Sequence, residues 1–87
     1  MIEFVSIKDV KLRIGALVKL LRKQEKLTQE ELAVKLSLSR ITVKNLELGG
    51  NATLDTLFKV LQYFDMLEQL DQYFKGETEK RSYKSLY

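Results

Sequence analysis

The segment LTQEELAVKLSLSRITVKNLELG, residues 27–49, constrains the fold most, because two short helices with separate start signals follow each other closely. Thr28 followed by Glu31 is a capping box, which predicts the start of a helix. Ser39 is a second N-cap residue, so another helix begins there. Gly49–Gly50 ends that helix, since Gly tolerates the positive φ that helix C-termini favour. The segment therefore predicts two packed helices joined by a tight turn.

The rest of the chain also has helical periodicity. A helix capped by Ser6 is expected to run to about Lys26. Asn51 or Thr53 caps a fourth helix, and a fifth is expected across residues 66–74. The 87 residues include no Pro, and no strand pattern appears among them. The fold class predicted from these elements is all-α, with five helices.

Domain organisation follows from where the pattern starts and stops. Residues 1–7 alternate weakly and are expected to form a short N-terminal arm, and residues 8–75 form the folded domain. Gly76 interrupts the apolar pattern. Residues 76–87 are polar and charged, and are predicted to be a flexible C-terminal tail.

Composition argues against enzymatic chemistry. The chain has neither His nor Cys, which removes the commonest general base and every thiolate ligand or nucleophile. Asp65, Glu68 and Asp71 lie three residues apart, and we interpret them as a solvated face or the rim of a dimer interface. We expect no enzyme activity, no metal and no cofactor.

Location is predicted from what the chain lacks. No apolar run approaches the roughly 20 residues of a membrane span, so no membrane partner is expected. The first ten residues lack the basic start and small-residue cleavage site of a signal peptide. We expect a cytoplasmic, nucleoid-associated protein.

The outer face of the third helix carries Arg40, Lys44 and Asn45, which the core does not need. In most amphipathic helices such side chains are simply solvated. Guanidinium and amide groups, however, can form the paired hydrogen bonds that base edges offer in the major groove. This favours a DNA-reading function.

The motifs of this segment resemble the helix-turn-helix family of lambda-type phage repressors, Cro proteins and XRE-type regulators. The similarity lies in the spacing of Gln29-Glu-Glu-Leu32-Ala33, Ser37-Leu38-Ser39, Thr42-Val43 and Leu46-Glu47-x-Gly49. The following GGNATLDTLFKVLQYF is similar to the family's fourth helix and the loop before it. The resemblance covers about residues 10–74. It implies a compact five-helix lambda repressor-like domain, with a helix-turn-helix at about 28–48, that binds double-stranded DNA and regulates transcription.

The resemblance also implies roles for individual residues. Residues expected to read bases are Arg40, Ile41 and Asn45. Residues expected to contact phosphates are Gln29, Ser39, Lys44, Gly50 and Asn51, together with the backbone amide of Ala52 in the same loop. Arg22 and Glu47 match a structural salt bridge of the family and are expected to be scaffold.

Two features depart from the family. Ser37 stands where many relatives have Gly, and in a left-handed conformation Ser costs about 1 kcal/mol relative to Gly. The charge balance also differs: residues 8–26 hold seven basic and two acidic side chains, whereas residues 27–53 hold three of each. A monomer with a neutral helix-turn-helix would bind DNA weakly.

We therefore expect a homodimer that reads a palindromic operator, with half-sites about one helical turn apart. The residues expected at the dimer interface are Phe64, Leu67, Leu70 and Phe74. The alternative is that these side chains, together with Phe58, Leu61 and Tyr63, only fill one core.

A protein-binding function competes with simple repression. Small helix-turn-helix proteins include antitoxins, and TLDTLFKVLQYF resembles the HipB-like group. An antitoxin would bind a partner toxin, through the segments MIEFVSI or GETEKRSYKSLY, and use DNA binding for autoregulation. The leading hypothesis is an autorepressor of its own operon, with the antitoxin role as the alternative.

Overall fold

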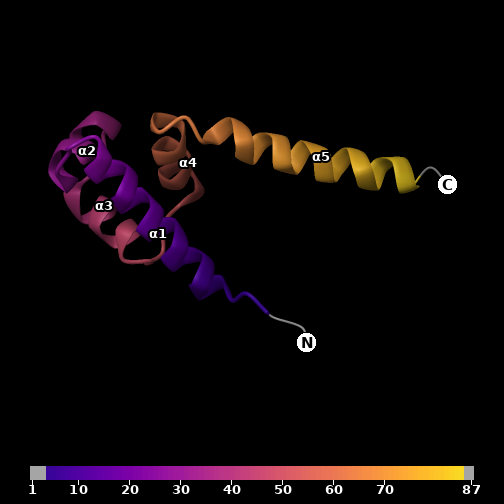
Figure 1. The fold of residues 1–87 in the computed structure, drawn as a ribbon, viewed down its shortest axis with the longest axis horizontal. Helices are drawn as coiled ribbons and strands as arrows, with labels where there is room; N and C mark the ends of the chain where they lie inside the picture. Colours follow the sequence, from indigo (N-terminus) through magenta and orange to yellow (C-terminus); the bar gives the residue numbers. More distant parts are fainter. Residues whose placement is uncertain (1–3, 86–87) are drawn as a thin grey trace.

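The computed structural model describes residues 4–85, and the side chains of residues 4–82, as five helices without a strand. These are α1 (Ile7–Gln24), α2 (Gln29–Leu36), α3 (Arg40–Glu47), α4 (Leu54–Tyr63) and α5 (Leu67–Ser85). The prediction of an all-α fold with five helices is confirmed. Figure 1 shows α1–α4 gathered together and α5 extending away from them to the C-terminus.

Side-chain caps fix where the first three helices begin. Ser6 Oγ accepts the Asp9 N–H and the Asp9 carboxylate accepts the Ser6 N–H, which forms a capping box at α1. Thr28 and Glu31 form a second capping box at α2, in which Thr28 Oγ1 accepts the Glu31 N–H and the Glu31 carboxylate accepts the Thr28 N–H. Ser39 Oγ accepts the Thr42 N–H at α3. All three predicted caps are confirmed.

The cap of α4 is Thr53, one of the two residues that the sequence left open. Its hydroxyl accepts the Thr56 N–H at 3.1 Å. The side chain of Asn51 is used differently, because its carbonyl accepts a hydrogen bond from the Lys11 ammonium. Asn51 therefore lies in the loop before the cap and is not the N-cap of α4.

The turn between α2 and α3 is tight because Ser37 adopts the left-handed conformation, with φ 55° and ψ 41°. This turns the chain back, and the next N–H, of Leu38, donates to the Ala33 carbonyl at 2.8 Å. Ser39 then starts α3 at once. The expected strain at Ser37 is thus present in the fold.

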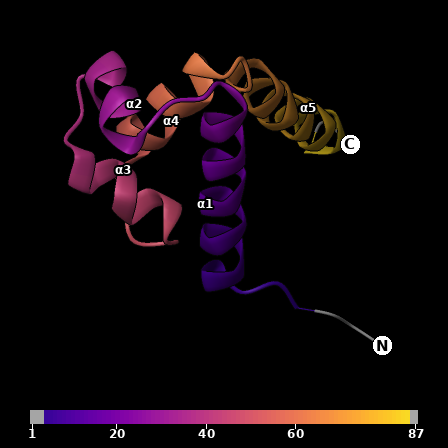
Figure 2. The same cartoon turned by 60° about the vertical axis from the view of Figure 1, so that its left-hand side comes forward.

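The core lies where α1, α2, α3 and α4 meet (Figure 2). Its buried side chains are Val18, Leu32, Ala33, Val43, Leu46 and Val60. A Cβ on Gly15 would lie 2.5 Å from the carbonyl oxygens of Leu46 and Glu47, so only Gly lets α1 pass this close to the end of α3. The close crossing fixes α3 against the long α1.

The C-terminal segment differs from the prediction. The sequence predicted a helix ending at Phe74 and a flexible tail from residue 76, but α5 continues through Gly76 to Ser85. The prediction of a helix end was wrong because a single Gly lowers helix propensity by only about 1 kcal/mol. Lys80 and Arg81 both pair with Glu77, which supports the helix beyond Gly76. Residues 86 and 87 lie outside the described part.

The N-terminal arm is shorter than predicted, since α1 already includes Ile7. Phe4 and Val5 precede the cap in non-helical conformation with exposed side chains. The first three residues of the predicted arm lie outside the described part.

Candidate nucleic-acid interface

The outer face of α3 presents the three residues expected to read bases. Arg40, Ile41 and Asn45 are all exposed, and Ile41 keeps 64% of its surface accessible although it is apolar. Val43 and Leu46 point the opposite way, into the core. Within residues 4–85, neither Arg40 nor Asn45 uses its side chain in a hydrogen bond or ion pair. Their donors and acceptors are therefore free for another molecule.

Lys44 and Ser39 lie beside this face. Lys44 is exposed on α3, one turn after Arg40. Ser39 is exposed too, but its hydroxyl already accepts the Thr42 N–H and lies 2.8 Å from the Thr42 hydroxyl. Ser39 is thus first of all the cap that starts α3. Any phosphate contact by Ser39 has to share this hydroxyl or use the backbone.

Behind α3, Arg22 and Glu47 form a buried ion pair. Arg22 Nε lies 2.6 Å from Glu47 Oε2, and Nη2 lies 2.9 Å from Oε1, so the contact is bidentate. The remaining arm of the guanidinium donates to the Leu27 carbonyl at 2.8 Å. This pair ties α1, the loop before α2 and the end of α3 together.

Gln29 completes the network. Its amide Nε2 donates to Glu47 Oε1 at 3.0 Å. One of the two N–H donors of the polar side chain expected to meet a phosphate is therefore used inside the protein. The second N–H of this amide and the backbone N–H groups at the start of α2 remain for a phosphate.

The network sets the charge state of its members. Burial raises the pKa of Glu47, but hydrogen bonds from Arg22 and Gln29, with the charges of Arg22 and Lys19, outweigh burial and lower the pKa overall. The hydrogen bonds that Arg22 donates to Glu47 raise the pKa of Arg22. Both groups are thus charged at neutral pH, and α3 is held by an intact ion pair.

The loop after α3 is closed by two Gly residues. Gly49 has a φ of 80°, and the Gly50 N–H donates to the Asn45 carbonyl at 2.8 Å. The amide of Gly50, expected to contact a phosphate, is therefore already used to end α3. In the described part of the chain, the backbone N–H groups of Asn51, Ala52 and Thr53 donate to no protein acceptor, so these three are the open amides of the loop.

Sequence reasoning missed two residues of this region. Gly15 lets α1 and α3 cross closely, and Lys11 reaches from α1 to Asn51. A Gly inside a helical pattern is itself a signal of close approach, because it otherwise only weakens the helix. No local pattern signals the contact of Lys11, since 40 residues separate it from its partner.

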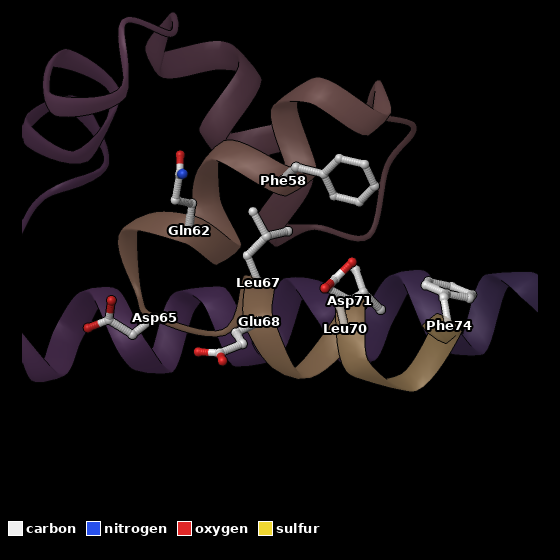
Figure 3. Close-up of a pocket in the computed structure, with 8 residues that line it drawn as sticks. All are labelled: Phe58, Gln62, Asp65, Leu67, Glu68, Leu70, Asp71 and Phe74. Atoms are coloured by element: carbon white, nitrogen blue, oxygen red, sulfur yellow. The ribbon is translucent and has the colours of Figure 1, made fainter. Parts of the chain in front are cut away.

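Three of the four residues expected at a dimer interface line a groove between α4 and α5 (Figure 3). Leu67 and Leu70 are half-buried there, Phe74 is 56% exposed, and Phe58 of α4 lines the same groove. Phe64 instead packs against the core, as the alternative interpretation expected of all four. Asp65, Glu68 and Asp71 border the groove with carboxylates.

Other kinds of site find no support in the described residues. They contain no group of three His, Cys, Asp or Glu side chains arranged to hold a metal ion. None of the helices in this part of the chain combines the length and apolar composition needed to cross a bilayer.

Comparison with known protein families gives a match over the part of the chain that contains α2 and α3. A family model described as Helix-turn-helix matches residues 18–70, which include α2, α3, α4, the last seven residues of α1 and the first four of α5. No curated protein matches the chain.

Proposed function

Because the chain belongs to the Cro/C1-type (XRE) helix-turn-helix family of DNA-binding transcriptional regulators, we propose that it represses its own operon by binding a palindromic operator as a homodimer. The observation that carries the proposal is the outer face of α3. Arg40 and Asn45 are exposed and unpaired there, while a buried ion pair holds the helix behind them. A helix held in one position can present such donors to base edges.

In the proposed complex, the N-terminal part of α3 enters the major groove. The Arg40 guanidinium donates two hydrogen bonds to a guanine, and the Asn45 amide pairs with an adenine. Ile41 packs against a thymine methyl group. The DNA phosphates are contacted from three places. These are Lys44 and Ser39 at α3, the start of α2 at Gln29, and the loop of Gly50 and Asn51.

The proposed homodimer uses the groove between α4 and α5. Leu67, Leu70 and Phe74 leave apolar surface partly exposed on α5, which packs mainly against α4. A second copy covering this surface would also double the DNA contacts. Doubling matters because the helix-turn-helix stretch of each copy is net neutral.

A gel-shift experiment tests the proposal with DNA from upstream of the coding region. Arg40→Ala and Asn45→Ala should each weaken specific binding by about 1–3 kcal/mol, and both should leave binding to random DNA nearly unchanged. Lys35→Ala, which removes an exposed cation at the end of α2, is the matched control. Helicity of all variants is checked by circular dichroism.

Indifference of the operator complex to both α3 variants would show that another face reads the DNA. Failure of the wild type to bind any duplex would reject the DNA-binding function itself.

A second function is favoured by one observation, the apolar surface before and at the start of α1. Phe4 is 86% exposed and Ile7 is 76% exposed. Exposed apolar side chains on a terminal segment fit a protein partner such as a toxin, with DNA binding as autoregulation. A neighbouring reading frame for a kinase or ribonuclease that co-purifies with the chain would support the antitoxin role. A phage structural or integrase-like neighbour would contradict it.

A further inference from the structure

The positive charge of the chain lies on α1 and not on the helix-turn-helix. Residues 8–26 carry a net charge of +5, whereas residues 27–53 carry none. Phosphate neutralisation by Lys and Arg supplies much of the affinity of proteins for DNA. A protein of this charge distribution therefore needs cations of α1 at the DNA surface.

One side of α1 runs along α3 toward the loop that follows it (Figure 2). Gly15 lies against the carbonyls at the end of α3, and Leu12 lies against Gly49 in the loop. Lys11, at the next position, extends past the end of α3 to Asn51. This side of α1 brings a cation to the loop expected to meet phosphates.

The Lys11 contact leaves several hydrogen-bond donors in one place. An ammonium group has three donors, and Asn51 accepts one of them. The amide NH2 of Asn51 and the N–H of Ala52 are open as well. Lys11 and Ala52 also border the same small hollow between α1 and the start of α4. A cation with several unpaired N–H groups on neighbouring residues suits a phosphate oxygen.

We propose that Lys11 is a phosphate-contacting residue that, with Asn51 and the Ala52 N–H, holds one phosphate of the DNA backbone beside the bases contacted by α3. This proposal rests on the proposed function. The hydrogen bond to Asn51 orients the ammonium before DNA arrives. Because a phosphate contact carries no sequence information, Lys11 contributes equally to operator and random DNA.

The test measures the dissociation constant on an operator duplex and a random duplex over roughly 50–200 mM salt. Lys11→Gln removes the charge and should reduce the slope of log K against log salt by about 0.9. It should weaken binding to both duplexes by the same factor. Lys11→Arg keeps the charge and should restore the slope. Arg13→Gln is the control, since it removes an exposed cation of the same helix about 200° around from Lys11.

An equal effect of Lys11→Gln and Arg13→Gln would overturn the proposal, because general charge would then suffice. Weaker binding of Lys11→Gln with an unchanged slope of log K against log salt would also overturn the proposal, because Lys11 would then only support the loop. Thermal unfolding of Lys11→Gln shows whether the fold is intact. Arg40→Ala, measured in parallel, should affect only the operator duplex. If Arg40→Ala has no effect while Lys11→Gln lowers the slope, the proposed reading face fails and the phosphate contact stands.

Discussion

At the residue scale, the ion pair of Arg22 and Glu47 links the stability of the domain to the position of α3. The Glu47 carboxylate is buried and accepts hydrogen bonds from three donors, two on Arg22 and one on Gln29. Removing one partner of such a pair leaves the other charge buried without compensation. The position of α3 therefore depends on a carboxylate that is buried behind its outer face.

The lowered pKa of Glu47 gives a pH dependence of stability. Its folded-state pKa lies below the ordinary 4.5, so the unfolded chain binds more protons as pH falls. The stabilisation is complete above about pH 4.5 and is lost as pH falls through the folded-state pKa. Urea unfolding from neutral to acid pH should show this loss.

Glu47→Gln should lower the free energy of unfolding at neutral pH by about 3–5 kcal/mol, and the gap to wild type should narrow on acidification. Glu30→Gln, an exposed change on α2, is the control and should have little effect. If the difference in free energy of unfolding between wild type and Glu47→Gln stays constant down to acid pH, the charge of Glu47 does not contribute to stability.

Ser37 stores local strain, because a β-carbon disfavours its φ of 55°. Ser37→Gly should raise the free energy of unfolding by about 0.5–1 kcal/mol, since strain relief exceeds the greater chain entropy of Gly in the unfolded state. Lys35→Gly, inside α2, should instead destabilise by a similar amount. An equal loss of free energy of unfolding in Ser37→Gly and Lys35→Gly would argue against strain at the turn.

At the element scale, two Gly residues inside helices differ in how closely other atoms approach them. Gly76 lies in α5 with no atom within 4 Å of the place where a Cβ would be. Gly15 lies in α1 with backbone carbonyls 2.5 Å from that place. The same substitution is therefore expected to have opposite effects in the two helices.

Gly76→Ala should increase helicity and stabilise α5 by about 1 kcal/mol, because Ala is the better helix former. Gly15→Ala should destabilise the domain by about 1–3 kcal/mol, since backbone atoms cannot move aside as a side chain does. Circular dichroism and urea unfolding measure both. No gain of helicity in Gly76→Ala would favour the flexible tail that the sequence first predicted.

At the scale of the whole molecule, α5 shapes the surface. It extends away from the other helices and leaves apolar side chains along its groove with α4 (Figures 1 and 3). Leu70 is half-buried in the middle of that groove, and Phe74 lies one turn further along. A second copy that covers these side chains would remove this surface from water.

Leu70→Lys should therefore convert the proposed dimer into a monomer in light scattering at tens of micromolar chain, and operator binding should weaken with it. Val34→Lys, which changes another exposed apolar residue outside the groove, should leave the mass unchanged. A wild type that scatters as a monomer would reject the dimer. A dimer unaffected by Leu70→Lys would place the interface elsewhere.

The sequence by itself determined the first four helices, the caps of the first three and the face of α3 that carries Arg40 and Asn45. These features depend on residues within a few positions of one another, through capping hydrogen bonds and helical periodicity. The match of Arg22 with Glu47 came from resemblance to a family, and the structure shows the pair in contact.

Only the tertiary structure decided which donors are free. Gln29 and Gly50 have a polar group engaged inside the protein, whereas Lys11 is brought to Asn51 from 40 residues away. It also decided that α5 runs through Gly76 and leaves an open groove with α4. The physical reason is the same in each case: caps and periodicity are local, but burial and long-range hydrogen bonds exist only after the helices have packed.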